Sequence, residues 1–109
     1  MTNTILTFGK VEIDALTVNK AQKVYRAFNH KLRQQLMDLI AGNPEITVTE
    51  MYIRLRIEQS VCSQHLAILR RAGLLGTTRT GKFSAYHLNE GMVSTLNEVS
   101  VILVNALKS

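Results

Sequence analysis

One segment, which begins at Ser60, constrains the fold of this chain more than any other. Ser60 is a good helix N-cap, and after it Cys62, Leu66 and Leu69 recur at i, i+4 and i+7. Gly73 follows this periodic run, in the place where a helix end favours glycine. The segment therefore predicts a well-defined helix with one buried apolar face and one polar face.

A predicted β-hairpin follows this helix. Within residues 74–88, Ser84, Tyr86 and Leu88 alternate with the residues between them, and a Thr-Gly-Lys turn centred on Gly81 divides the segment in two. Arg79 precedes this turn and Lys82 belongs to it. We therefore expect two short strands with a basic tip.

The remaining segments are mostly helical in pattern. Apolar residues recur at helical spacing over residues 18–28 and 32–40, and a Gly-Asn-Pro sequence ends the second run. Residues 46–48 predict a short β stretch, after which Thr49 is expected to cap a short third helix. Residues 90–107 form a last amphipathic run.

The order of these elements predicts the fold class. Two helices, a short strand, two helices joined by a tight turn, a hairpin and a final helix (α-α-β-α-α-β-β-α) form a mainly α winged helix-turn-helix with a small β-hairpin. A length of 109 residues suits one domain, so we expect residues 1–109 to form a single winged-helix DNA-binding domain with terminal dimerisation helices.

Charge and cysteine content narrow the function further. Thirteen Lys and Arg against eight Asp and Glu give a net charge of +5, which favours a polyanionic partner such as nucleic acid. A single cysteine cannot form an intramolecular disulfide, and the N-terminal residues lack a signal-peptide pattern, so we expect a cytoplasmic protein that does not bind a membrane. No catalytic constellation is visible, and we expect neither enzymatic activity nor a cofactor.

Three segments, residues 27–40, 59–75 and 79–88, carry a family resemblance. In this order they resemble the core, the recognition helix with its exit, and the basic wing of the ArsR-type (ArsR/SmtB) transcriptional repressors. The resemblance implies a homodimer that binds double-stranded operator DNA with an inverted repeat and that represses transcription. Repressors of this type commonly leave DNA when an effector binds, and the sequence does not identify that effector.

The residues expected to contact DNA lie on the polar face of the predicted helix and at the tip of the wing. Glutamine amides can pair with adenine, serine hydroxyls can bind phosphate oxygens, and basic side chains neutralise phosphates. These residues are Gln59, Ser60, Ser63, Gln64, His65, Arg70, Arg79 and Lys82. For His65 a contact with DNA and a bond to the neighbouring helix both remain open, whereas for Arg33 we favour a structural hydrogen bond.

The dimer interface is expected in the first and last helices, which carry more apolar positions than one small domain can bury. In the last helix the apolar positions form a 4-3-4-3 seam. The predicted interface residues are Leu16, Val24, Phe28, Met92, Leu96, Val99, Leu103 and Ala106.

The metal sites of the resembling family are expected to be absent. Where one subset has a Cys-x-Cys pair, this sequence has Thr47 and Thr49, which are poor ligands for soft metals. Where another subset has acidic and histidine ligands, Glu90 is followed by Met92, Leu103 and Ala106, and His30, His65 and His87 are scattered.

Two alternatives accompany the repressor interpretation. The chain could be a winged-helix protein-interaction module, in which case its positive charge would be incidental. It could also be a redox-responsive regulator that uses Cys62, although the spacing of Cys62 with Leu66 and Leu69 favours a buried apolar role.

Overall fold

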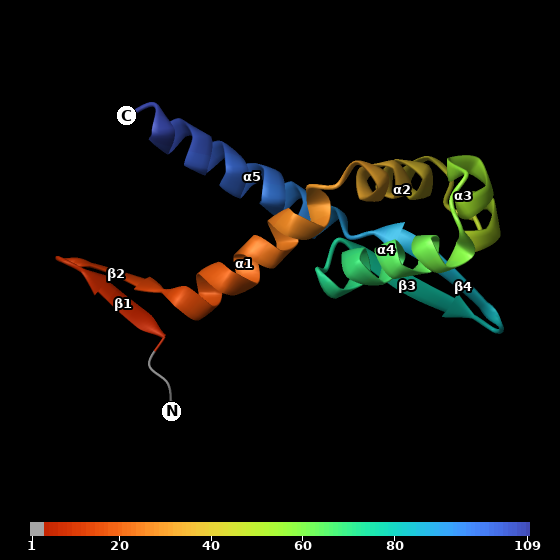
Figure 1. Cartoon of the computed structure of the whole chain (residues 1–109), viewed down its shortest axis with the longest axis horizontal. Helices are drawn as coiled ribbons and strands as arrows, with labels where there is room; N and C mark the ends of the chain where they lie inside the picture. The colour runs from red at the N-terminus through yellow and green to blue at the C-terminus, as the bar shows by residue number, and fades with distance from the viewer. Residues whose placement is uncertain (1–3) are drawn as a thin grey trace.

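The computed structural model describes residues 4–109, so residues 1–3 of the predicted domain lie outside the described part. The elements, in chain order, are β1 (Ile5–Phe8), β2 (Val11–Asp14), α1 (Ala15–Phe28), α2 (Lys31–Gly42), α3 (Val48–Leu55), α4 (Gln59–Arg71), β3 (Leu75–Thr80), β4 (Phe83–Leu88) and α5 (Glu90–Leu107). The predicted fold class, a mainly α winged helix-turn-helix, is confirmed (Figure 1).

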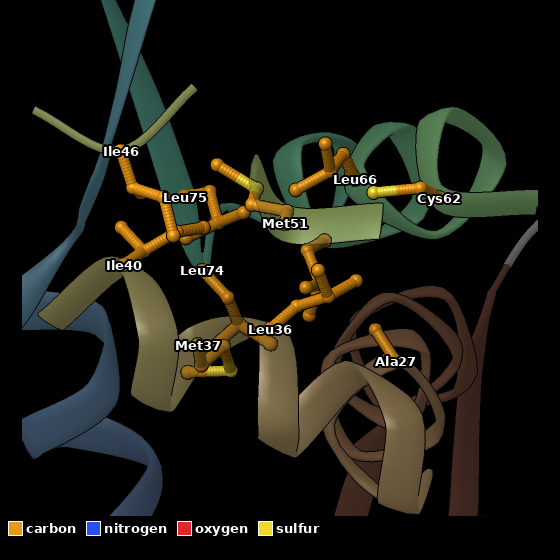
Figure 2. Close-up of a cluster of buried hydrophobic side chains, with 11 residues drawn as sticks. Ala27, Leu36, Met37, Ile40, Ile46, Met51, Cys62, Leu66, Leu74 and Leu75 are labelled. Carbon is orange, nitrogen blue, oxygen red and sulfur yellow. The ribbon is translucent and has the colours of Figure 1, made fainter. Parts of the chain in front are cut away.

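The hydrophobic core lies where α2, α3, α4 and β3 meet, with one residue from α1 (Figure 2). The apolar face expected for α4 is buried there, because the side chains that recur every third or fourth residue share one side of a helix. The buried core residues are Ala27, Leu36, Met37, Ile40, Ile46, Met51, Cys62, Leu66, Leu69, Leu74 and Leu75.

A tight turn joins α3 to α4 and creates the helix-turn-helix. Arg56 ends α3 in the left-handed conformation, with φ of 55°, and its N–H donates to the carbonyl of Ile53. At the other end of α4, Gly73 has φ of +79°, and the N–H of Leu74 donates to the carbonyl of Leu69. The predicted role of Gly73 at the end of this helix is therefore confirmed.

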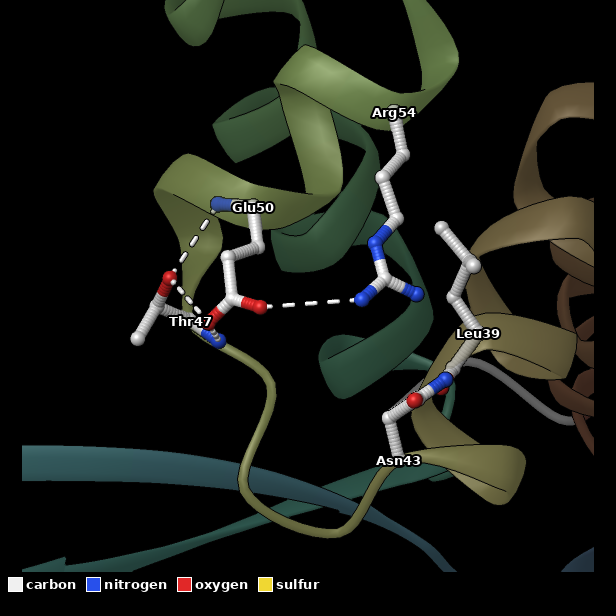
Figure 3. A network of polar contacts seen from close by, with 5 residues as sticks. All are labelled: Leu39, Asn43, Thr47, Glu50 and Arg54. Carbon is white, nitrogen blue, oxygen red and sulfur yellow. Dashed lines mark hydrogen bonds and ion pairs between the residues drawn. The ribbon is translucent and has the colours of Figure 1, made fainter.

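The segment before α3 corrects two predictions. Residues 46–48 do not form a strand, because the N–H of Ile46 donates to the carbonyl of Asn43 in a turn. The apolar side chain of Ile46 is buried in the core. Thr47, not Thr49, caps α3: Thr47 Oγ1 accepts the N–H of Glu50 at 3.1 Å, and Glu50 Oε1 accepts the N–H of Thr47 at 3.3 Å (Figure 3). This reciprocal capping box satisfies two N–H groups that a helix start leaves free.

The predicted N-cap of α4, Ser60, lies two positions after the observed one, Glu58. The helix begins at Gln59, with Glu58 in the N-cap position, and Ser60 lies in the first turn. The N–H of Cys62 donates to the backbone carbonyl of Glu58, so the helix starts without a side-chain cap. Ser60 is consequently free to face outward from the first turn.

An N-terminal hairpin, β1–β2, was not predicted. Its strands pair antiparallel from Ile5–Asp14 to Phe8–Val11, and Asp14 then caps α1 by accepting the N–H of Leu16. Figure 1 shows α1 and α5 leaving the winged-helix body and diverging, with the hairpin at the far end of α1. Over residues 4–109, no helix combines the length and apolar character that crossing a bilayer requires.

The wing matches its prediction closely. Strands β3 and β4 pair from Leu75–Leu88 to Thr80–Phe83, so the turn falls at Gly81 and Lys82. Gly81 has φ of +63°, a conformation that glycine adopts without steric cost. The wing therefore follows α4 directly and projects beside it.

Candidate nucleic-acid interface

Helix α4 presents a polar face opposite the core. Cys62, Leu66 and Leu69 are buried, which turns the other side of the helix to solvent. The predicted contact residues that are exposed on this helix are Gln59, Ser60, Ser63, Gln64 and Arg70. A row of amides and hydroxyls at the first half of a helix can reach base edges and phosphates together.

His65 differs from the other predicted contacts because it is only half-exposed and bonds α2. Its Nδ1 lies 3.3 Å from Arg33 Nη1, and its ring centroid lies 4.8 Å from that of His30. Arginine can only donate, so His65 Nδ1 is the acceptor. Burial, with smaller contributions from His30 and Arg33, lowers the pKa of His65 below its ordinary value. The structure therefore places His65 at the junction of α2 and α4.

Arg33 makes the structural bonds that the sequence favoured. Its Nε donates to the carbonyl of Ala27 at 2.6 Å, and its Nη2 donates to the carbonyl of Arg26 at 3.1 Å. These carbonyls lie in the last turn of α1, so one guanidinium connects α1, α2 and, through His65, α4. It thereby links the helix that carries the polar face to both α1 and α2.

The wing carries its two predicted cations at or next to the tip. Arg79 and Lys82 are exposed, and Arg79 Nε donates to the carbonyl of Gly81 at 3.3 Å. Neither has a carboxylate partner among residues 4–109, where the ion pair found is Arg54–Glu50. Their charge is available to phosphates of a neighbouring duplex.

Cys62 belongs to the core and not to the polar face. Its side chain is 0% exposed, and burial raises the pKa of the thiol. A protonated, buried thiol is a poor nucleophile, because the thiolate is the reactive form. This geometry favours the apolar role over the redox alternative.

The predicted dimer residues divide into two groups. Val24, Phe28, Met92 and Leu96 are half-buried and pack against the chain's own core. Leu16, Val99, Leu103 and Ala106 are exposed, and Leu103 is 54% exposed. Leu16 lies in the first turn of α1, and Val99, Leu103 and Ala106 lie in the second half of α5. Figure 1 shows both helices extending away from the body.

Sequence reasoning missed much of the exposed apolar surface. The hairpin adds Ile5, Leu6, Phe8, Val11 and Ile13, of which Phe8 is 67% exposed. The first strand, Ile-Leu-Thr-Phe, does not alternate, and the second, Val-Glu-Ile-Asp, alternates over only four residues, so period-two analysis gives too short a signal. The hairpin and the end of α5 therefore both expose large apolar side chains to solvent.

Sequence reasoning also missed two cations beside α4. Lys23 and Arg26, three residues apart on α1, line a groove together with Arg33 and Arg71. Their i, i+3 spacing was a signal of a shared helix face. As for metals, residues 4–109 contain no group of three or more potential ligands among His, Cys, Asp and Glu.

Comparison with known proteins gives consistent results. Residues 30–76 match the family model described as bacterial regulatory protein, arsR family. Among curated relatives, the transcriptional activator HlyU of Vibrio cholerae is 35% identical over 80 residues, covering 73% of this chain and 73% of that protein. The arsenic resistance transcriptional regulator ArsR2 of Pseudomonas putida is 31% identical over 76% of this chain and 72% of its own length.

Solved structures agree with this comparison. Reduced HlyU from Vibrio cholerae superposes with a TM-score of 0.57 at 33% identity, covering 77% of this chain and 92% of that one. A homodimeric winged helix-turn-helix DNA-binding domain from Mycobacterium bovis superposes with a TM-score of 0.68 at 22% identity, covering 89% of this chain and 90% of that one. The second likeness concerns the fold alone.

Proposed function

The chain belongs to the arsR family of bacterial regulatory proteins, and we propose that within this family it is a cytoplasmic repressor that binds an inverted-repeat operator as a homodimer. The family resemblance expected from the sequence is confirmed, and so is the expectation of a transcriptional regulator instead of an enzyme. The operator, the dimer and the direction of regulation are proposals.

One observation carries the proposal: the polar face of α4 and the basic wing are both exposed and stand next to each other in the chain. Gln64 and Ser60 supply groups that discriminate base edges or bind phosphates, whereas Arg79 and Lys82 supply charge. A major groove admits one α-helix, and the adjacent wing can then follow the flanking backbone. We infer that α4 supplies specificity and the wing supplies affinity.

Exposed apolar side chains support the homodimer. Val99, Leu103 and Leu107 on α5 and Phe8 on the hairpin are all exposed, with Leu107 at 84%. A second copy of the chain is the simplest cover, since symmetric homodimers dominate soluble oligomers. Two copies of α4 related by a two-fold axis would meet half-sites about one helical turn apart.

The proposed direction of regulation is repression, because a dimer bound to its operator can block transcription without a further surface that contacts another protein. Relatives named for both directions exist: HlyU is called an activator, and SdpR of Bacillus subtilis a repressor. We also propose that the chain does not use the family's metal sites. Thr47 is engaged in the cap of α3, and Leu103 and Ala106 offer no donor atom.

Selection of duplexes from a random-sequence library with the wild-type chain tests the proposal. We expect enrichment of an imperfect inverted repeat whose half-site centres lie about 10 base pairs apart. If no sequence is enriched and salt does not weaken the binding of duplex DNA, the result would instead support the protein-interaction alternative. A reporter under an enriched sequence then gives the direction, and a rise in expression with the regulator present would contradict repression.

A further inference from the structure

A groove between α1 and the second half of α4 carries several cations outside the predicted DNA-contact residues. It encloses about 350 Å³, and four cations line it: Lys23, Arg26, Arg33 and Arg71. Its floor is apolar, with Ala27 and Ile68, and no carboxylate belongs to its lining. A concave surface that concentrates positive charge in this way attracts an oxyanion.

Three of the four cations are free to bind a ligand. Lys23, Arg26 and Arg71 are exposed, and within residues 4–109 none of their side chains has a hydrogen-bond or ion-pair partner. Arg33 is already committed to the carbonyls of Ala27 and Arg26, so it contributes charge without being displaced. In this groove the Arg33 side chain is held by hydrogen bonds, whereas the other three basic side chains can move to bind an anion.

The position of the groove indicates which anion it meets. Ser60, Gln64, Ile68 and Arg71 follow one another at i, i+4, i+8 and i+11, so they share one face of α4. The face that is proposed to read DNA thus runs directly into the groove. A duplex lying along Ser60 and Gln64 brings its sugar-phosphate backbone toward the far end of this face, where Arg71 stands.

We propose that this groove is a second backbone-binding site, in which Lys23 and Arg26 of α1 and Arg71 of α4 hold phosphodiester groups of the same duplex. The inference rests on the proposed function, since it requires that α4 faces DNA. Its consequence is that α1 contributes to affinity for DNA.

The double variant Lys23→Gln/Arg26→Gln tests this site, with Lys10→Gln/Lys108→Gln as the matched control that removes the same charge elsewhere. The readout is the slope of log affinity against log salt concentration on a random-sequence duplex. Each lost phosphate contact reduces the magnitude of this slope by about 0.9. We therefore expect the slope of the groove variant to be smaller in magnitude than that of wild type by about 1.8 per protomer, and the slope of the control to stay near wild type. Thermal melting by circular dichroism should match wild type, because both replaced side chains are exposed.

Equal slopes for the groove variant and the control would overturn the inference while leaving the proposed function standing. Absence of salt-sensitive duplex binding by the wild-type chain would overturn both. A titration with inorganic phosphate at constant ionic strength separates the source of the anion. If the groove variant loses binding of free phosphate but keeps the wild-type duplex slope, the groove is a small-anion site and the duplex assignment is wrong.

Discussion

Arg33 Nη1 on α2 lies 3.3 Å from His65 Nδ1 on α4, and this contact requires His65 to be neutral. A protonated imidazole would turn an N–H toward a guanidinium that can only donate. The same guanidinium bonds two carbonyls at the end of α1. The hydrogen bond that joins this guanidinium to the helix proposed to read DNA therefore depends on the protonation state of one histidine.

This coupling predicts how stability depends on pH. The pKa of His65 is lowered from its ordinary 6.5, mainly by burial. As the pH falls below 6.5, His65 therefore binds a proton in the unfolded chain before it does so in the folded chain. The stabilisation is complete above this value and is lost as the pH falls toward the folded-state pKa. We expect the wild-type free energy of unfolding to fall over this range more steeply than that of His65→Gln.

The matched control is His87→Gln, since His87 is exposed on the wing. Urea unfolding at a series of pH values gives the comparison. If His65→Gln and wild type show the same pH dependence, the proton linkage assigned to His65 is wrong.

The capping box of α3 predicts different outcomes for two neighbouring threonines. Thr47→Ala removes the acceptor for the N–H of Glu50 and should cost about 1 kcal/mol of unfolding free energy. Thr49→Ala changes an exposed residue inside the helix and should remain within about 0.5 kcal/mol of wild type. Chemical denaturation measures both, and a larger loss for Thr49→Ala would contradict the cap.

The proposed dimer predicts a strong effect of charge on α5. Leu103→Glu places a carboxylate in the seam that the partner is proposed to cover, and desolvating it should weaken the dimer by roughly 2 kcal/mol or more. Ile53→Glu is the control, because Ile53 is equally apolar and exposed but lies on α3, in the winged-helix body. Sedimentation equilibrium reports both, and an undiminished dimer for Leu103→Glu would exclude this interface.

Segments with a single periodicity and clear end signals were predictable from the sequence. The core spacing of Cys62, Leu66 and Leu69, the glycine after α4 and the Gly81 turn each have one physical interpretation, and the structure has all three. The bounds of α5 also match the predicted residues 90–107.

Features that depend on tertiary context were not predictable. Ile46 resembles a strand residue by propensity, yet its burial in the core and its turn hydrogen bond decide its conformation. The groove beside α4 combines Lys23 and Arg26 with Arg71, which is distant in sequence, so no local pattern reveals it. The role of His65 depended on Arg33, which lies 32 residues away.

The most direct test of DNA recognition by α4 compares Gln64→Ala with wild type on two duplexes of equal length, one selected by the wild-type chain and one with its bases shuffled. At a fixed salt concentration, loss of the amide should weaken binding to the selected duplex by about 1–3 kcal/mol and leave binding to the shuffled duplex unchanged. Arg79→Ala, the charge control, should weaken both. An equal loss on both duplexes for Gln64→Ala would contradict the account that the exposed polar face of α4 reads sequence.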